Sequence, residues 1–315
     1  MGHQVNPELV AVRADKLFFY SPYNFLRKLD VQTQQQLFGT GQAEQYAADA
    51  THRVFEFAQQ GATVQFLYAF LPWDTDFFQA PVYKVFTALF ADTTPASLLA
   101  AAGEAFRRQL RQEGAAYCFA ELPAEDTRVA QALGDAGWRL VETRLTYFHD
   151  AVATFEQPRY LVRLAQTEEA AAIGSISAAA RNEYDRFHAD QWFAGGKGDQ
   201  FLARYASAAV EGYCDAVLVP DEPGLSVDSF LAISDLQAHA AGLNTGFSRV
   251  VLTAVGPANR GWHLKLVSET VQRARHQGAD YVLMTTQATN RAVFRTCEKL
   301  GFRVGSTSHV LAWSL

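Results

Sequence analysis

An internal repeat constrains the fold more than any other feature of this chain. Laying residue 117 on residue 281 gives an ungapped alignment with an offset of 164, the difference between these two numbers. The matched pairs are Tyr117 with Tyr281, Ala124 with Ala288, Val129 with Val293, Gly137 with Gly301, Arg139 with Arg303 and Thr143 with Thr307. Both copies show the pattern of a strand, a short loop, a helix ended by a capping glycine and a β-hairpin. The repeat predicts two related α/β domains.

The length and composition suit two folded domains. The chain has 315 residues, of which 49% are hydrophobic and 19% charged, so a sizeable core is expected and global disorder is not. We expect domains at 1–155 and 156–315. In the first domain we expect an extra, mostly helical segment at 16–60, strands at 61–71 and 82–90, and a turn-rich link at 71–78. In the second domain we expect strands at 160–165, 216–220, 230–240, 250–255 and 281–286, and helices at 168–180 and 201–212.

Charge and cysteine usage exclude several classes of protein. The net charge of −6 comes with no Lys/Arg stripe, so nucleic acid is not an expected partner. Cys118, Cys214 and Cys297 lie far apart without metal-ligand spacing, which favours reduced thiols and no metal site. The N-terminal residues show no secretory signal, and the apolar runs are too short to span a bilayer. We therefore expect a cytoplasmic protein without a membrane partner.

The second copy contains a candidate anion site that the first copy lacks. The β-rich run 250–255 leads through Arg260 and Gly261 into an amphipathic helix. A helix that begins this way presents free backbone N–H groups and a positive dipole end to a phosphate. The matching positions in the first copy are Ala96 and Ser97, with no glycine to let the backbone approach a phosphate. Only the second copy is expected to bind such a ligand.

The order of elements from Ser248 to Leu315 resembles the acyl-coenzyme A binding half of the GNAT (GCN5-related N-acetyltransferase) superfamily. The resemblance implies tandem GNAT-like domains, each a mixed central sheet flanked by helices, with a degenerate N-terminal copy. It also implies acetyl-CoA, or another acyl-CoA, as cofactor. The family signature is Gln/Arg-x-x-Gly-x-Gly/Ala, and Arg260 matches its first position. His263 and Lys265 stand where the family has glycines.

These two departures leave two interpretations open. In one, backbone amides still face the pyrophosphate and Lys265 adds a charged contact. The cofactor-binding residues are then Arg260, Gly261, Trp262, His263, Leu264 and Lys265. In the other, side chains crowd the loop and an ordinary helix start remains.

The resemblance assigns roles to four further residues. Ala254 and Val255 would offer backbone N–H groups to the pantetheine arm and the acyl carbonyl. Asn290 caps the last helix and would also contact pantetheine. The family often carries a proton-donating Tyr seven residues after this Asn, and here that position is Cys297. Cys297 is therefore the catalytic candidate, with a small buried residue as the alternative.

The segment 180–193 is dense in polar and aromatic residues, which suits an acceptor site or a helix hairpin held by ordinary ion pairs. Arg186, His188 and Asp190 are the candidate substrate contacts. Within the superfamily, 186–190, 286–290 and 301–307 resemble the dTDP-fucosamine (dTDP-4-amino-4,6-dideoxygalactose) N-acetyltransferase branch. The segment 71–78 resembles its Leu-x-Trp-Asp-x-x-Phe-Phe motif.

The sequence thus predicts an acetyl-CoA dependent N-acetyltransferase acting on a small primary amine, with a nucleotide-linked amino sugar as one candidate. Direct transfer in a ternary complex is expected, because no residue is an evident acyl-enzyme nucleophile. Two alternatives stay open: a non-catalytic acyl-CoA or ligand-binding module, and a tandem-GNAT aminoacyl or peptide acyltransferase. A homodimer is a candidate assembly.

Overall fold

The computed structural model describes residues 4–315, and the chain divides into two compact units. The first unit extends to Arg144 and includes Ser306–Leu315, and the second is Leu145–Gly305. This division differs from the expected boundary near residue 155. The C-terminal segment joins the first unit because residues Ser308–Ser314 of strand β11 (Arg303–Ser314) pair with β4 (Tyr117–Pro123).

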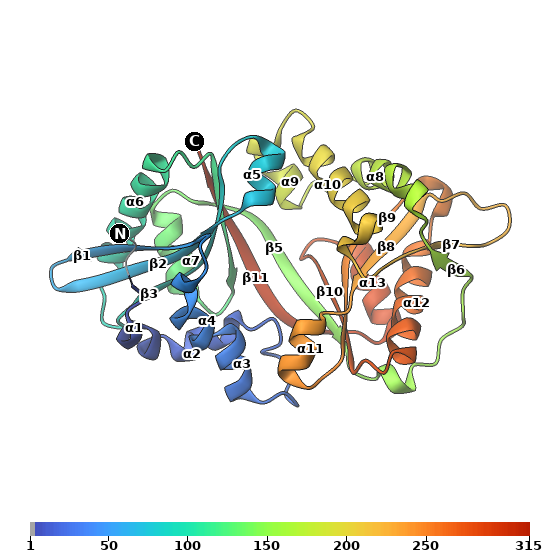
Figure 1. The fold of residues 1–315 in the computed structure, drawn as a ribbon, viewed down its shortest axis with the longest axis horizontal. Helices are drawn as coiled ribbons and strands as arrows, with labels where there is room; N and C mark the ends of the chain where they lie inside the picture. Colours follow the sequence, from blue (N-terminus) through green and yellow to red (C-terminus); the bar gives the residue numbers. More distant parts are fainter. Residues whose placement is uncertain (1–3) are drawn as a thin grey trace. The chain divides into compact units, whose positions relative to one another are not determined.

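The first unit consists of a sheet covered by helices on both faces (Figure 1). Its strands pair in the order β1-β2-β3-β4-β11 and are antiparallel apart from the parallel pair β3/β4. The strands β1 (His52–Gln59), β2 (Ala62–Phe70) and β3 (Val82–Phe90) precede β4 in the chain. Strand β5 (Arg139–His149) begins in the first unit and continues into the second. The helices are α1 (Pro7–Val12), α2 (Ala14–Leu17), α3 (Val31–Phe38), α4 (Thr40–Glu44), α5 (Pro72–Phe78), α6 (Ala96–Gln112) and α7 (Thr127–Asp135).

The second unit has the same plan. Its strands pair in the order β10-β9-β8-β7-β6, with β9 and β10 parallel. The strands are β6 (Val162–Leu164), β7 (Ala216–Pro220), β8 (Ser229–Ser234), β9 (Phe247–Val255) and β10 (Tyr281–Gln287). The helices are α8 (Ala170–Ala179), α9 (Arg186–Ala189), α10 (Lys197–Ala208), α11 (Gln237–Leu243), α12 (Trp262–His276) and α13 (Arg291–Leu300).

Alternation along the strands builds two cores in the second unit. Leu231 and Ile233 of β8 pack with α12 and α13, while Phe230 and Ala232 pack with α8 and α10. Successive strand side chains point to opposite faces, so a strand buried on both faces is apolar throughout. Among residues 4–315, no helix has the length and apolar character that crossing a bilayer requires.

The structure extends the repeat over nearly the whole chain. Adding 164 to the bounds of β4 gives 281–287, which are the bounds of β10. With the same offset, β1 begins at the position where β7 begins. The bounds of α5 fall within one residue of those of α11, and α3 and α4 together correspond to α10. The glycines that follow the equivalent helices share a left-handed φ, 81° at both Gly137 and Gly301. The N-terminal helical segment is therefore not an addition, because it corresponds to the α8–α10 region of the second unit.

Several local predictions were wrong. Residues 52–59 form strand β1, because Val54 and its neighbours pair with β2 and contribute to the core. The 71–78 link is helix α5, started by Pro72 at its first position. The expected 230–240 strand ends at Ser234, and α11 follows. Each expected C-terminal hairpin is one long strand, β5 or β11.

Candidate functional site

The two parallel strands of the second unit separate at their carboxyl ends. β9 and β10 pair from Phe247 with Tyr281 to Val250 with Met284. Beyond this point, β9 pairs only with β8 among the described strands, as far as Val255 with Ser229. Ala254 is buried and Val255 is half-buried. The strand split therefore leaves backbone groups of 251–255 on the β10 side without a strand partner within the described chain, where Ala254 and Val255 were expected to serve.

Asp228, just before β8, and Ser229, the first residue of β8, hold the loop between β9 and α12. The Ala258 N–H donates to Asp228 Oδ2 at 2.7 Å, and the Gly256 N–H donates to the Asp228 carbonyl at 2.6 Å. The buried Asn259 donates from Nδ2 to Ser229 Oγ at 3.0 Å. Sequence reasoning missed Asp228 and Asn259, although the Gly256-Pro257 pair is a turn signal that marks this loop.

The N-terminus of α12 is open. Gly261 precedes the helix with a φ of 91°, a conformation that favours glycine. No described side chain caps the helix, and a Cβ added at Gly261 would meet nothing within 4 Å. Arg260 is exposed and makes no ion pair with the described residues. The first-turn amides, including those of Trp262, His263 and Leu264, are thus free for an anion.

The two departures from the family signature are both bound within the protein. Lys265 Nζ lies 2.8 Å from Glu222 Oε1 and 4.2 Å from the centre of the Trp262 ring. His263 Nδ1 lies 3.0 Å from Thr296 Oγ1 on α13. Burial lowers the pKa of His263 to about 4, so this side chain is neutral near pH 7. Both side chains help to fix α12, and the predicted contact of Lys265 with phosphate would require it to leave Glu222.

Asn290 caps α13 as expected. Its Oδ1 accepts the Val293 N–H at 3.2 Å, which leaves the amide Nδ2 without a partner among residues 4–315. Asn290 follows β10, one of the two strands that border the split, just beyond its carboxyl end. It can therefore cap the helix with oxygen and donate from nitrogen to a ligand.

Cys297 lies in the core and not in an accessible site. Its exposed fraction is 0%, and it packs within the cluster that includes Val267 and Leu300. Burial, with a smaller contribution from the charge of Glu298, raises the pKa of the thiol to about 12. The matching residue of the first unit is the buried Leu133. We therefore do not retain Cys297 as the proton donor, because a departing thiolate could not reach it.

The candidate substrate contacts are also occupied within the protein. His188 bridges two carboxylates, with Nδ1 2.8 Å from Asp185 Oδ1 and Nε2 2.9 Å from Asp199 Oδ1. Arg186 is buried with its guanidinium 4.6 Å from the centre of the Phe187 ring, and Asp190 is 4% exposed. His188 thus links α9 to Asp199 of α10, Arg186 packs on Phe187 and Phe193, and Asp190 accepts the Trp192 N–H, as expected for a helix hairpin held by its own pairs. Arg181, Glu183, Tyr184 and Gln191 are the polar and aromatic residues of this segment whose side chains are exposed.

The first unit fills its own strand split with the N-terminal segment. β3 and β4 also separate after four pairs, the last being Val85 with Ala120. Arg13 is 2% exposed, and its Nη2 lies 2.5 Å from Asp126 Oδ2. Its guanidinium also lies 4.4 Å from the centre of the Phe90 ring, at the end of β3. Sequence reasoning missed the role of Arg13, because its partner is 113 residues away and no local pattern indicates the pair.

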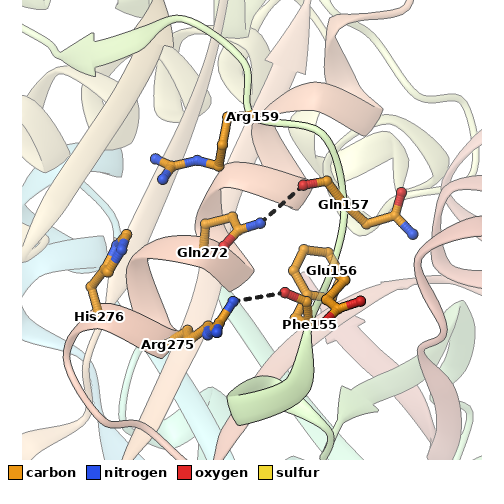
Figure 2. A pocket seen from close by; sticks show the side chains of 7 residues that line it. All are labelled: Phe155, Glu156, Gln157, Arg159, Gln272, Arg275 and His276. Carbon is orange, nitrogen blue, oxygen red and sulfur yellow. Dashed lines mark hydrogen bonds between the residues drawn. The ribbon is translucent and has the colours of Figure 1, made fainter.

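A separate hollow lies at the opposite end of α12 from Gly261. It measures about 710 Å³, and Figure 2 shows the seven residues around it. Gln272 donates to the Gln157 carbonyl at 3.2 Å, and Arg275 donates to the Phe155 carbonyl at 3.1 Å. These bonds tie the 155–159 segment to α12. The hollow contains none of the predicted site residues.

Comparisons with solved structures identify the fold. A GCN5-related N-acetyltransferase from Sphaerobacter thermophilus matches with a TM-score of 0.55 at 10% identity, over 100% of this chain and 95% of that chain. A GCN5-related glucosamine N-acetyltransferase region of a fungal multi-domain GH3 β-N-acetylglucosaminidase matches with a TM-score of 0.59 at 12% identity, over 99% of this chain and 38% of that chain. A functionally unknown conserved protein from Staphylococcus epidermidis matches with a TM-score of 0.52 at 10% identity, over 83% of this chain and 94% of that chain.

No protein-family model and no curated protein matches the sequence. The structural likeness therefore shows the fold alone. The chain has the fold of GCN5-related N-acetyltransferases, and its two repeated units confirm the predicted tandem α/β class.

Proposed function

We propose that this chain is an acyl-CoA dependent N-acyltransferase, with acetyl-CoA as the cofactor and the second unit as the active half. The observation that carries the proposal is the open, glycine-started N-terminus of α12, placed directly after a strand that has separated from β10. This combination offers an anion site beside a slot with free backbone groups. The first unit has Arg13 in the equivalent slot, so we propose one cofactor per chain.

The residues of the second unit fit the cofactor in three parts. The amides from Gly261 to Leu264 and the Arg260 guanidinium would hold the pyrophosphate. Arg291 and Arg295 are exposed on α13, which meets α12 through the contact between Thr296 and His263, and they add positive charge at this end. Asn290 Nδ2 would donate to the pantetheine arm.

The acceptor would be a small primary amine, and a nucleotide-linked amino sugar of the dTDP-fucosamine type stays one candidate. Transfer would be direct, within a ternary complex, because the buried thiol of Cys297 cannot serve as an acyl-enzyme nucleophile. The backbone N–H of Val255 would stabilise the charge that develops on the acyl oxygen. It lies on the β10 side of β9, because the Gly256 N–H donates to the Asp228 carbonyl and alternate residues, including Ala254, face β8.

One observation favours a second candidate, a non-catalytic acyl-CoA binding module. Three positions that carry chemistry in the resemblance, His263, Lys265 and Cys297, are all engaged in the protein's own packing or pairing. A domain that had kept its ligand and lost its chemistry would show this pattern.

Ligand binding and thiol release separate the two candidates. Desulfo-CoA at a hundred times its dissociation constant should stabilise the protein by about 2.7 kcal/mol, and acetyl-CoA with an amine panel should release free CoA thiol. Arg260→Ala should weaken desulfo-CoA binding, whereas the control Arg108→Ala, exposed in the first unit, should not. The absence of any stabilisation at saturation would refute the cofactor site. Binding without thiol release from any amine would establish the binding module.

A further inference from the structure

Tyr20 and Tyr184 are equivalent residues of the two units. They are separated by the repeat offset of 164, the difference between 184 and 20. Each follows the first helix of its copy, α1–α2 in one unit and α8 in the other. The two side chains nevertheless lie in opposite environments, and this contrast carries the inference.

Tyr20 bridges the strand split of the first unit. Its hydroxyl donates to Asp126 Oδ2 at 2.7 Å and accepts from Thr87 Oγ1 at 2.9 Å. Thr87 lies on β3 beyond the last β3/β4 pair, and Asp126 follows β4. The hydroxyl therefore occupies the gap between the two diverging strands.

Tyr184 lies outside the corresponding gap. It is 57% exposed, and its side chain makes no hydrogen bond with residues 4–315. Its loop is nonetheless fixed to the border of the split, because Asn182 Nδ2 donates to Gln287 Oε1 at 2.7 Å and Gln287 ends β10. Asn182 Oδ1 also accepts the Tyr184 N–H at 3.1 Å.

The chemistry of the two splits explains the difference. In the first unit the buried carboxylate of Asp126 accepts hydrogen bonds from both Arg13 and Tyr20. The equivalent residues in the second unit are Asn290, Ser177 and Tyr184, so no charge pair holds the loop in the slot. The slot stays available for a ligand, and Tyr184 stays at its edge.

We propose that Tyr184 turns into the split of the second unit when both substrates are bound and donates its phenolic proton to the departing thiolate. The amine nitrogen bonds to the acyl carbon and the carbon–sulfur bond breaks. The sulfur takes the Tyr184 proton, and the proton lost by the nitrogen returns to the tyrosinate through water. This inference rests on the proposed acyltransferase function and supplies the proton donor that Cys297 cannot be.

Kinetics of Tyr184→Phe test the chemical role, with Tyr213→Phe as the control. Tyr213 is also exposed in the second unit, at 66%. We expect Tyr184→Phe to lower kcat about 100-fold, the lower end for a general acid, with little change in the KM for acetyl-CoA. A Tyr184→Phe variant with the wild-type kcat would overturn the proposal.

Nitration of tyrosine tests closure without turnover. Tetranitromethane should modify Tyr184 and Tyr213 in the free protein. Saturating desulfo-CoA with a competent amine should protect Tyr184 and leave Tyr213 reactive. If the thermal shift shows bound desulfo-CoA and the amine is a proven acceptor, yet Tyr184 stays reactive, the closure is refuted. If desulfo-CoA produces no thermal shift, the proposed function fails first, and this inference fails with it.

Discussion

Asp126 and Asn290 precede the equivalent helices α7 and α13, yet only Asn290 caps its helix. The Asn290 side chain accepts the Val293 N–H, whereas the Asp126 carboxylate accepts from Arg13 and Tyr20. At this position of the repeat, Asp126 binds the N-terminal segment that contains Arg13 and Tyr20 in the first unit. In the second unit, Asn290 keeps its amide Nδ2 available as a donor. This difference separates the filled slot from the open one.

Asp126→Asn should destabilise the first unit strongly. The ion pair between Arg13 and Asp126 is buried, with both side chains 1% exposed, so removing one charge leaves an unpaired guanidinium in the interior. We expect a loss of about 3–5 kcal/mol in the free energy of unfolding, measured with urea. The control Asp135→Asn, exposed on α7, should change it by less than about 0.5 kcal/mol. Equal stability of the two variants would contradict the assigned pairing.

Asn290 variants should separate capping from ligand binding. Asn290→Ala should cost about 1 kcal/mol of stability through the lost cap and should also weaken desulfo-CoA binding. Asn290→Ser retains a capping oxygen but lacks the amide donor. We therefore expect near wild-type stability and weaker binding, measured by denaturation and calorimetric titration. Unchanged binding in the serine variant would rule out the donor role.

Gly261→Ala should reveal backbone strain at the start of α12. The φ of 91° disfavours a side chain, although a Cβ there would meet no atom within 4 Å. We expect a loss of about 1–2 kcal/mol in the free energy of unfolding. Gly134→Ala is the matched control, because this glycine lies in α7 and its added Cβ is also unobstructed. It should stabilise by about 0.5–1 kcal/mol, so two substitutions of one type should have opposite signs.

Cys297 should be unreactive in the native protein. With no exposed area and a pKa raised to about 12, its thiol should react with iodoacetamide at pH 8 only after unfolding. Mass spectrometry of the alkylated peptides would measure this. Cys297→Ala should retain the wild-type kcat for acyl transfer, with any loss confined to stability. A large fall in kcat at unchanged stability would restore the catalytic role.

His263 should make stability depend on pH on the acid side. Its folded pKa of about 4 lies below the ordinary value of 6.5, so the unfolded state binds the proton more tightly. The free energy of unfolding should therefore fall as the pH drops from 6.5 to 4, by up to about 3 kcal/mol from this residue. His149 and His239 also have lowered pKa values, so the difference between wild type and His263→Asn isolates the effect. Parallel pH curves for the two proteins would contradict the assignment.

Local signals predicted the elements that contain the open helix start. The run 250–261 predicted a strand and a glycine-started helix, and Asn290 predicted a cap, because each depends on residues only a few positions apart. Signals that depend on distant residues were missed. The strand 52–59 was assigned to a helix because its pairing with β2 and its burial are tertiary facts. The roles given to Arg186, His188 and Asp190 overlooked the burial of Arg186 and Asp190 and the contact of His188 with Asp199 of α10.

The duplication is apparent in the sequence alone, since glycines such as Gly137 and Gly301 are required at fixed positions by backbone geometry. The sequence also shows that the second copy contains the Arg260-Gly261 helix start. Which strand split is open depends on the folded structure, because burial and long-range pairing set that outcome. Arg13 meets Asp126 across 113 residues and fills one split, Cys297 is enclosed by its neighbours, and Tyr184 is left at the edge of the other split.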